Sequence, residues 1–229
     1  MKTAFLRRLP LLAVLCLGLA PPLAAFAQDK GKDKDKAAVA TIAQQPRGIY
    51  ATIDMRPARD MIARLNSPSG SVRRPAMREV QKDASLHMPP VLYALANAFS
   101  ADDPEDAIFW YNVGRIRAVY DGLRCRDVTA RSGVTAIGKD MNLELRRALF
   151  FQRNQLVDIA TKAIEWDAKN PRNYDQRWIA LFGKVANSSA GTETVITVPE
   201  SEWPDILKKV HETHLQSVRE FAAEKKGTK

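Results

Sequence analysis

The sequence predicts a mainly α-helical fold, built as an antiparallel bundle of helix hairpins or a short solenoid, with at most one or two short β-strands. Two observations carry this prediction. Apolar residues recur every three to four positions over most of the chain. Prolines and capping residues also stand where the apolar patterns begin, as they do at the first turns of helices.

The first 27 residues have the pattern of a cleaved secretory signal peptide. A basic segment comes first, with Lys2, Arg7 and Arg8. An apolar stretch follows over residues 11–20, and Ala25-Phe26-Ala27 is a small-residue cleavage site. The apolar stretch is too short to span about 30 Å of hydrocarbon as a helix. The expected location is therefore periplasmic, and the mature chain is expected to begin at Gln28.

The mature chain is expected to hold one domain between two polar ends. Lysine and aspartate alternate over residues 29–36, so residues 28–47 are interpreted as a disordered charged linker. A single helical domain is expected over residues 48–224, followed by a frayed tail over 225–229. Because Cys16 would leave with the signal peptide, Cys125 would be the only cysteine, and packing must stabilise the domain.

The first elements of the domain are expected to be short. Residues 48–53 follow a turn signal and are rich in β-formers, which predicts a strand. Helices are expected over residues 57–65 and 75–84, with a loop over 66–71. Pro75 is placed in the first turn of the second helix, where its missing N–H costs nothing.

A helix hairpin over residues 90–120 is the clearest element. A turn over residues 100–103 separates two helices, and the second begins at Pro104 with Asp103 as its N-cap. Apolar residues on several sides of this second helix predict a place in the centre of the core. Gly122 is expected to end it.

The second half of the chain is predicted to contain three helices and one strand. Near-helical apolar spacing predicts a long helix over residues 143–166 and an amphipathic helix over 174–185. Residues 192–198 are rich in β-formers and are interpreted as a strand. The last helix is expected over residues 202–223, with Ser201 as its cap.

Few residues in the sequence suggest chemistry. His211 and His214 stand three residues apart on the predicted last helix, but no third metal ligand is apparent, so His214 is expected at the core edge and His211 in solvent. The acidic cluster over residues 102–106 lies where helix capping explains it. We therefore expect no enzyme activity, no cofactor and no metal. A hydrolase with a hidden pair of carboxylates stays an alternative.

Positive charge is the most suggestive feature of the composition. The formal net charge is +9, and loss of the three basic residues of the signal leaves about +6, which favours acidic partners. Arginine binds carboxylates bidentately and is frequent at protein interfaces. The expected partner surface consists of Arg115, Arg117, Arg124 and Arg126. An ordinary solvated surface stays open as the alternative, and a nucleic-acid partner is not expected because aromatic residues do not interleave with the arginines.

The hairpin also carries a repeat-like pattern. Leu95-Ala96 is followed by Phe99, and the second helix contains Ala107-x-x-Trp110-Tyr111, with the small residue Gly114 one turn later. In these positions the hairpin resembles one unit of the Sel-like repeats, which are short relatives of the tetratricopeptide repeat. Arg115 departs from the family pattern, which has a small residue there, and the Gly-rich loop between the helices is absent.

The resemblance implies a function in binding. Such repeats stack helix hairpins and bind proteins. Exported members include immunity proteins that neutralise toxins delivered into the periplasm by type VI secretion. The resemblance thus implies a periplasmic protein-binding module without a transmembrane span, and within that class an immunity protein whose partner is an acidic toxin. An envelope scaffold protein without a toxin partner is the alternative.

Overall fold

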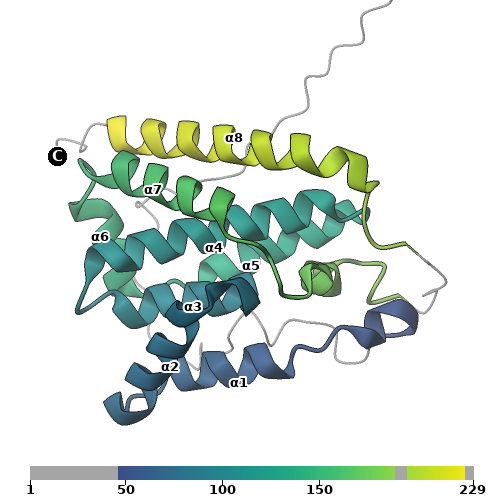
Figure 1. The fold of residues 1–229 in the computed structure, drawn as a ribbon, viewed down its shortest axis with the longest axis horizontal. Helices are drawn as coiled ribbons and strands as arrows, with labels where there is room; N and C mark the ends of the chain where they lie inside the picture. Colours follow the sequence, from purple (N-terminus) through teal and green to yellow (C-terminus); the bar gives the residue numbers. More distant parts are fainter. Residues whose placement is uncertain (1–45, 189–194, 225–229) are drawn as a thin grey trace, which may run out of the picture. The chain divides into compact units, whose positions relative to one another are not determined.

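The computed structural model describes residues 46–188 and 195–224, which belong to one compact unit of the chain. These residues form eight α-helices and several 3₁₀-helices, with one isolated antiparallel β-bridge between Cys125 and Thr197 (Figure 1). The predicted mainly α-helical class is therefore confirmed. The expected signal peptide, the expected tail and almost all of the expected linker lie outside the described residues. No helix in the described part has the length and apolar character needed to cross a bilayer.

The first segment is helical where a strand was predicted. Gly48–Thr52 forms a 3₁₀-helix that begins with a positive φ of 56° at Gly48. Tyr50 and Ile53, three residues apart, are both buried, and the three-residue period of a 3₁₀ turn brings such residues to one side. An extended segment would have placed them on opposite faces.

Helices α1 (Arg56–Leu65) and α2 (Gly70–Lys82) follow. Helix α1 matches its prediction, whereas α2 starts five residues earlier than expected and holds Pro75 in its interior. Ala76 and Val80, both fully buried, fix this helix to the core. Pro75 cannot donate to the carbonyl of Ser71, but both residues are exposed, so water can satisfy that carbonyl.

The predicted hairpin is present as α3 (Pro89–Phe99) and α4 (Pro104–Arg124). The side chain of Asp103 accepts a hydrogen bond from the backbone N–H of Asp106 at 3.1 Å, which confirms it as the N-cap. Helix α4 continues past Gly122, because the backbone there keeps helical geometry and Cys125 becomes the cap. Trp110 is only 6% exposed, in agreement with a central position.

The second half differs from its prediction in three places. The long helix is divided into α6 (Leu143–Phe151) and α7 (Leu156–Lys169) at a run of polar residues without an apolar anchor. Helix α5 (Ser132–Lys139) was not predicted. The helix expected over residues 174–185 is the 3₁₀-helix Gln176–Phe182. The final helix, α8 (Trp203–Ala223), is present as predicted, although Ser201 lies in a preceding 3₁₀ turn and does not cap it.

The strand predicted over residues 192–198 is not formed by its described part. Its first three residues lie outside the described ranges, and Val195–Val198 makes only the bridge of Thr197 to Cys125. The backbone N–H of Arg126 donates to the carbonyl of Ile196 at 2.9 Å, and that of Val198 donates to Arg124 at 2.8 Å. The segment therefore pairs with the end of α4 and has no second strand beside it.

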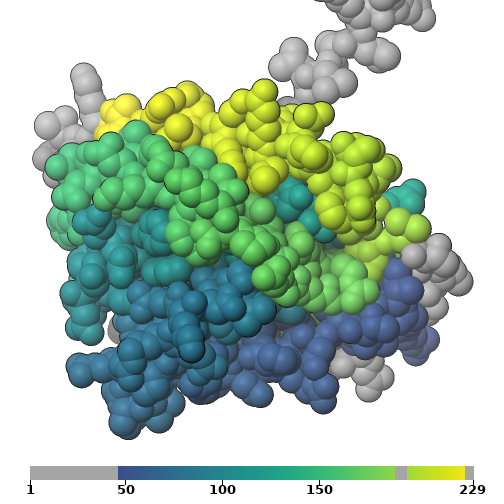
Figure 2. Space-filling view, viewed as in Figure 1, coloured from purple at the N-terminus to yellow at the C-terminus, as the bar shows by residue number. Residues whose placement is uncertain are grey.

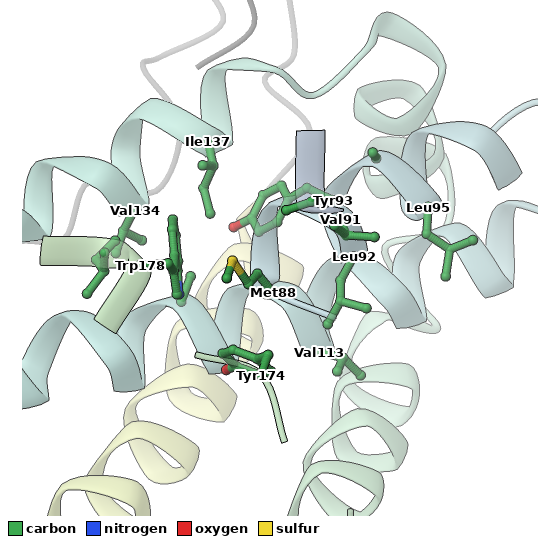
Figure 3. Packing of buried hydrophobic residues seen from close by; sticks show 14 of the residues in the cluster. Met88, Val91, Leu92, Tyr93, Leu95, Val113, Val134, Ile137, Tyr174 and Trp178 are labelled. Atoms are coloured by element: carbon green, nitrogen blue, oxygen red, sulfur yellow. The ribbon is translucent and has the colours of Figure 1, made fainter. Parts of the chain in front are cut away.

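Helix α4 lies at the centre of the domain. Helix α3 packs on one side of it and α7 and α8 on another, and the space-filling view shows α8 lying directly along α7 (Figures 1 and 2). Side chains of α3, α4 and the 3₁₀-helix Gln176–Phe182 meet in the core, where Tyr93, Met88 and Trp178 lie close together (Figure 3). Gly114 permits the close approach of α4 to α3, because a Cβ atom there would lie 2.9 Å from Cδ2 of Tyr93 and 3.2 Å from Cβ of Leu92.

The close packing at Gly114 gives a first prediction. We expect Gly114→Ala to lower the free energy of unfolding by about 1–3 kcal/mol, because overpacking outweighs the gain in helix propensity. The matched control is Gly138→Ala in α5, where an added Cβ meets no atom within 4 Å and the propensity gain should stabilise or be neutral. Chemical denaturation of both variants measures the difference. Equal stability of the two variants would contradict close packing of α3 on α4.

Candidate functional site

Helix α4 buries three charged side chains on one face. Arg117, Asp121 and Arg124 are four and three residues apart, which is the spacing of one helix face, and they are 0%, 1% and 3% exposed. Other polar and charged side chains from α7, α8 and the loop after α7 meet this face. We call the set the buried polar cluster; it consists of Arg117, Asp121, Arg124, Asp167, Arg172 and His211.

Asp167 of α7 is the acceptor that joins the cluster. Its carboxylate accepts from Nε of Arg117 at 2.9 Å, from a terminal guanidinium nitrogen of Arg172, and lies 2.9 Å from Nε2 of His211. Burial alone would raise the pKa of this carboxyl group. The His211 hydrogen bond and the charges of Arg172 and Arg117 outweigh burial and hold the pKa of Asp167 below its ordinary value. The carboxylate therefore stays ionised inside the protein.

All three guanidinium nitrogens of Arg117 donate hydrogen bonds. Besides Asp167, its guanidinium donates to the carbonyl oxygens of Ala84, Asn170 and Pro171 at 3.2–3.3 Å. Its Cζ also lies 4.9 Å from the ring centroid of Trp166. These bonds connect α4 to the 3₁₀ turn before α3 and to the loop after α7. Arg117 is thus a structural cation that holds three segments together.

Asp121 lies one turn further along α4 and has a different environment. Its Oδ2 accepts from the Tyr174 hydroxyl at 3.0 Å and from the Trp178 indole N–H at 2.8 Å. Burial raises the pKa of Asp121 to about 7, although those hydrogen bonds and the charges of Arg124 and Arg172 act against the shift. A carboxyl group that titrates near neutrality is a signal of function or of a structural network. At 1% exposure Asp121 does not meet solvent, and its contacts are those of a structural network.

Helix α8 is attached to α4 and α7 through polar groups. The Trp203 indole lies 3.8 Å from the guanidinium carbon of Arg124, and His211 contacts Asp167. Further along, Nε2 of His214 lies 2.7 Å from Oδ1 of Asn112 on α4. Only Val210 and His214 of this helix are fully buried. These polar contacts add to the apolar contacts of α8, in which Trp203, Ile206 and Leu207 pack against the core.

The expected partner surface is divided by the structure. Arg117 and Arg124 are buried and paired inside the domain, so neither offers a free cation to a partner. Arg115 is half-buried beside Tyr93 and Tyr111. Arg126 is exposed. These four arginines were predicted at the surface because each was considered without a partner. The available signal that Arg117 and Arg124 are buried was Asp121, which stands four residues after Arg117 and three before Arg124.

Exposed apolar and basic residues surround Arg126. Val128 and Val195 are 60% and 48% exposed. We call this surface the Arg126 patch; it consists of Arg126, Val128, Arg131, Lys184 and Val195. Backbone contacts hold it together, because Arg126 pairs with Ile196 and the N–H of Lys184 donates to Oγ1 of Thr129 at 2.8 Å.

The carboxylate of Asp127 holds the backbone segments that carry the Arg126 patch. One of its oxygens accepts from the backbone N–H of Thr129 at 2.9 Å and the other from that of Val185 at 3.0 Å. Burial would raise the pKa of Asp127, but these hydrogen bonds outweigh it and lower the pKa. Gly183 passes so close that a Cβ atom there would collide with Asp127. The carboxylate is thus occupied within the loop, and the exposed side chains of the patch carry positive charge.

The two histidines of α8 do not converge. His211 bonds to Asp167 on α7, whereas His214 bonds to Asn112 on α4, so the expectation that His211 is solvated was wrong and that for His214 is confirmed. Within residues 46–188 and 195–224, no three side chains of His, Cys, Asp or Glu are arranged to hold a metal ion. No family model, characterised protein or solved structure shows significant similarity to this chain.

The pairing of Asp167 gives a prediction about stability. Asp167→Asn would leave Arg117 buried without its counter-charge, and we expect a loss of about 3–5 kcal/mol in unfolding free energy. The matched control is Asp175→Asn, because Asp175 and Arg177 form a partly exposed ion pair at 2.7 Å, and such pairs contribute about 0–1 kcal/mol. Denaturant unfolding of both variants tests this. Similar small losses in both would mean that the cluster tolerates an uncompensated Arg117.

His214 predicts a dependence of stability on acid. Burial, with Arg115 and His211 nearby and only partly opposed by Asp167, lowers its pKa from 6.5 to about 3. Because the pKa of His214 is lower in the folded chain than in the unfolded chain, neutral His214 stabilises the fold fully at pH values above the unfolded pKa of 6.5. This contribution to the unfolding free energy is lost as the pH falls from 6.5 towards 3. We expect the wild type to lose roughly 2–3 kcal/mol more than His214→Gln between about pH 7 and pH 4.

The comparison with His214→Gln isolates this histidine. The glutamine amide can still donate to Asn112 but does not titrate. Asp121 acts in the opposite direction, since its raised pKa destabilises the fold as pH rises towards about 7. Because both proteins retain Asp121, its contribution cancels in the difference. Parallel pH profiles of the two proteins would show that His214 is not held neutral in the fold.

Proposed function

We propose that this chain is a periplasmic protein-binding module that recognises an acidic face of another protein through the Arg126 patch, and that it acts by binding and not by catalysis. The observation that carries the proposal is the patch itself, in which three exposed cations surround two exposed valines. Interfaces favour arginine beside apolar contacts, and steering by positive charge speeds association with acidic partners. The patch rests on backbone hydrogen bonds, so little conformational entropy is lost on binding.

The resemblance to Sel-like repeats supports the same class of function. The residues that carry it, including Leu95, Ala96, Ala107 and Trp110, are buried within the α3–α4 hairpin. Such residues build a rigid scaffold and leave recognition to the surface. Within this class we propose an immunity protein that neutralises a toxin delivered by type VI secretion. The acidic residues of the toxin would be the partner of the patch.

Charge reversal in the patch tests the proposal. The partner is first isolated by using the wild-type chain as bait in a periplasmic extract. We expect Arg126→Glu combined with Lys184→Glu to slow association with this partner about tenfold at low salt and to weaken the salt dependence of the association rate. Arg59→Glu combined with Arg78→Glu on α1 and α2 is the control, because it changes the net charge equally at other exposed positions. Surface plasmon resonance at two salt concentrations gives the rates.

A growth assay then addresses the immunity role. If the product of an adjacent gene is toxic in the periplasm, co-production of the wild-type chain should restore growth, and the patch variant should protect less than the Arg59/Arg78 variant. Failure to bind any periplasmic protein would contradict the binding function. Binding with unchanged kinetics in the patch variant would contradict only the choice of surface. Binding without protection would favour an envelope scaffold.

A further inference from the structure

Helix α6 presents an apolar surface at both of its ends. Leu143 at its start is 60% exposed and Phe151 at its end is 70% exposed. The opposite side of the helix is fixed in the core by Leu145 and Ala148. The two exposed residues are eight positions apart, which corresponds to about 12 Å along a helix axis. Leucine and phenylalanine are among the residue types most often found fully buried.

Basic residues lie between these two apolar ends. Arg146 and Arg147 are exposed on α6, and Lys139 is exposed just before it. Nε of Arg146 donates to the carbonyl of Met141 at 3.0 Å, which holds this side chain along the helix. Glu144 pairs with Arg147 at 2.8 Å, so the surface retains an excess of positive charge.

The C-terminal end of α8 adjoins this surface. Cζ of Arg153, just after α6, lies 4.4 Å from the ring centroid of Phe221, and its NH2 lies 3.5 Å from a carboxylate oxygen of Glu224. Figure 1 shows α6 at the same end of the domain as the end of α8.

We propose that this surface, which we call the α6 face and define as Leu143, Arg146, Arg147 and Phe151, binds the surface of a lipid bilayer that contains anionic headgroups. An interfacial helix inserts apolar side chains among the acyl chains while its arginines contact phosphates. Leu143 and Phe151 are eight residues apart, which is about 80° around a helix of 3.6 residues per turn, so both can face one plane that is parallel to its axis. The intervening arginines match the headgroup charge.

Other occupants fit the α6 face less well. A second copy of the chain would place Arg146 and Arg147 against the same cations of the partner, and like charges at an interface are unfavourable. An acidic protein would need two separate pockets about 12 Å apart to receive both apolar residues. A bilayer requires no pocket, because its interface accepts apolar groups anywhere along the plane. The proposal is independent of the Arg126 patch, which lies on other segments of the chain.

Vesicle flotation with the full exported chain tests the proposal. Vesicles of phosphatidylcholine alone are compared with vesicles that contain about one-third phosphatidylglycerol. We expect the wild type to bind the anionic vesicles at least tenfold more tightly. Leu143→Ser with Phe151→Ser should reduce this binding about tenfold, and Arg146→Glu with Arg147→Glu should remove the preference for anionic lipid.

The control is Val128→Ser, which removes an equally exposed apolar side chain from the Arg126 patch and should leave vesicle binding unchanged. Circular dichroism establishes that each variant is folded. The proposal is wrong if the wild type does not bind, if it binds both kinds of vesicle equally, or if Val128→Ser reduces binding as much as the α6 variants. It is also wrong if sedimentation shows a dimer that the α6 variants dissociate, because the face would then join two copies.

Discussion

The buried ion pair between Arg117 and Asp167 constrains the rest of the domain. A guanidinium in the middle of a core is tolerated only when a carboxylate and further acceptors replace water. Those acceptors come from two segments far apart in the sequence: Ala84 precedes α3, whereas Asp167 lies in the last turn of α7 and Asn170 follows that helix. The central helix therefore reaches its place only together with these segments. We infer that the pair contributes less to net stability than to fixing one arrangement of the helices.

The same carboxylate determines how α8 is held. Asp167 accepts from Arg117 and Arg172 and contacts His211 of α8, so one group serves both the core and the last helix. A purely apolar contact between α8 and α4 would depend little on pH. The contact between these helices includes His214, which hydrogen-bonds Asn112 and whose lowered pKa keeps it neutral. We therefore expect the docking of this helix to depend on the protonation state of His214.

What could be predicted from the sequence follows from how local each signal is. The α3–α4 hairpin was predicted because Asp103 and Pro104 mark the start of α4 within a few residues. The burial of Arg117 and Arg124 was not, because their partners Asp167 and Gln176 lie about 50 residues further on. The β-formers of residues 48–53 were misleading because burial of Tyr50 and Ile53 decided their conformation. The Arg126 patch required the contact with Ile196, which no local pattern indicates.

The proposed surfaces have a defined spatial relation through α4. Asn142, the N-cap of α6, bonds to Asn97 and Ser100 beside the turn that leads into α4, and Ala148 of α6 shares a cluster with Ile108. Arg126 instead lies two residues after Arg124, the last residue of α4. A helix of 21 residues is about 30 Å long, so the α6 face and the Arg126 patch lie near its opposite ends. The two proposed surfaces therefore share no residue and lie apart along α4, so the two proposed interactions are compatible in one molecule.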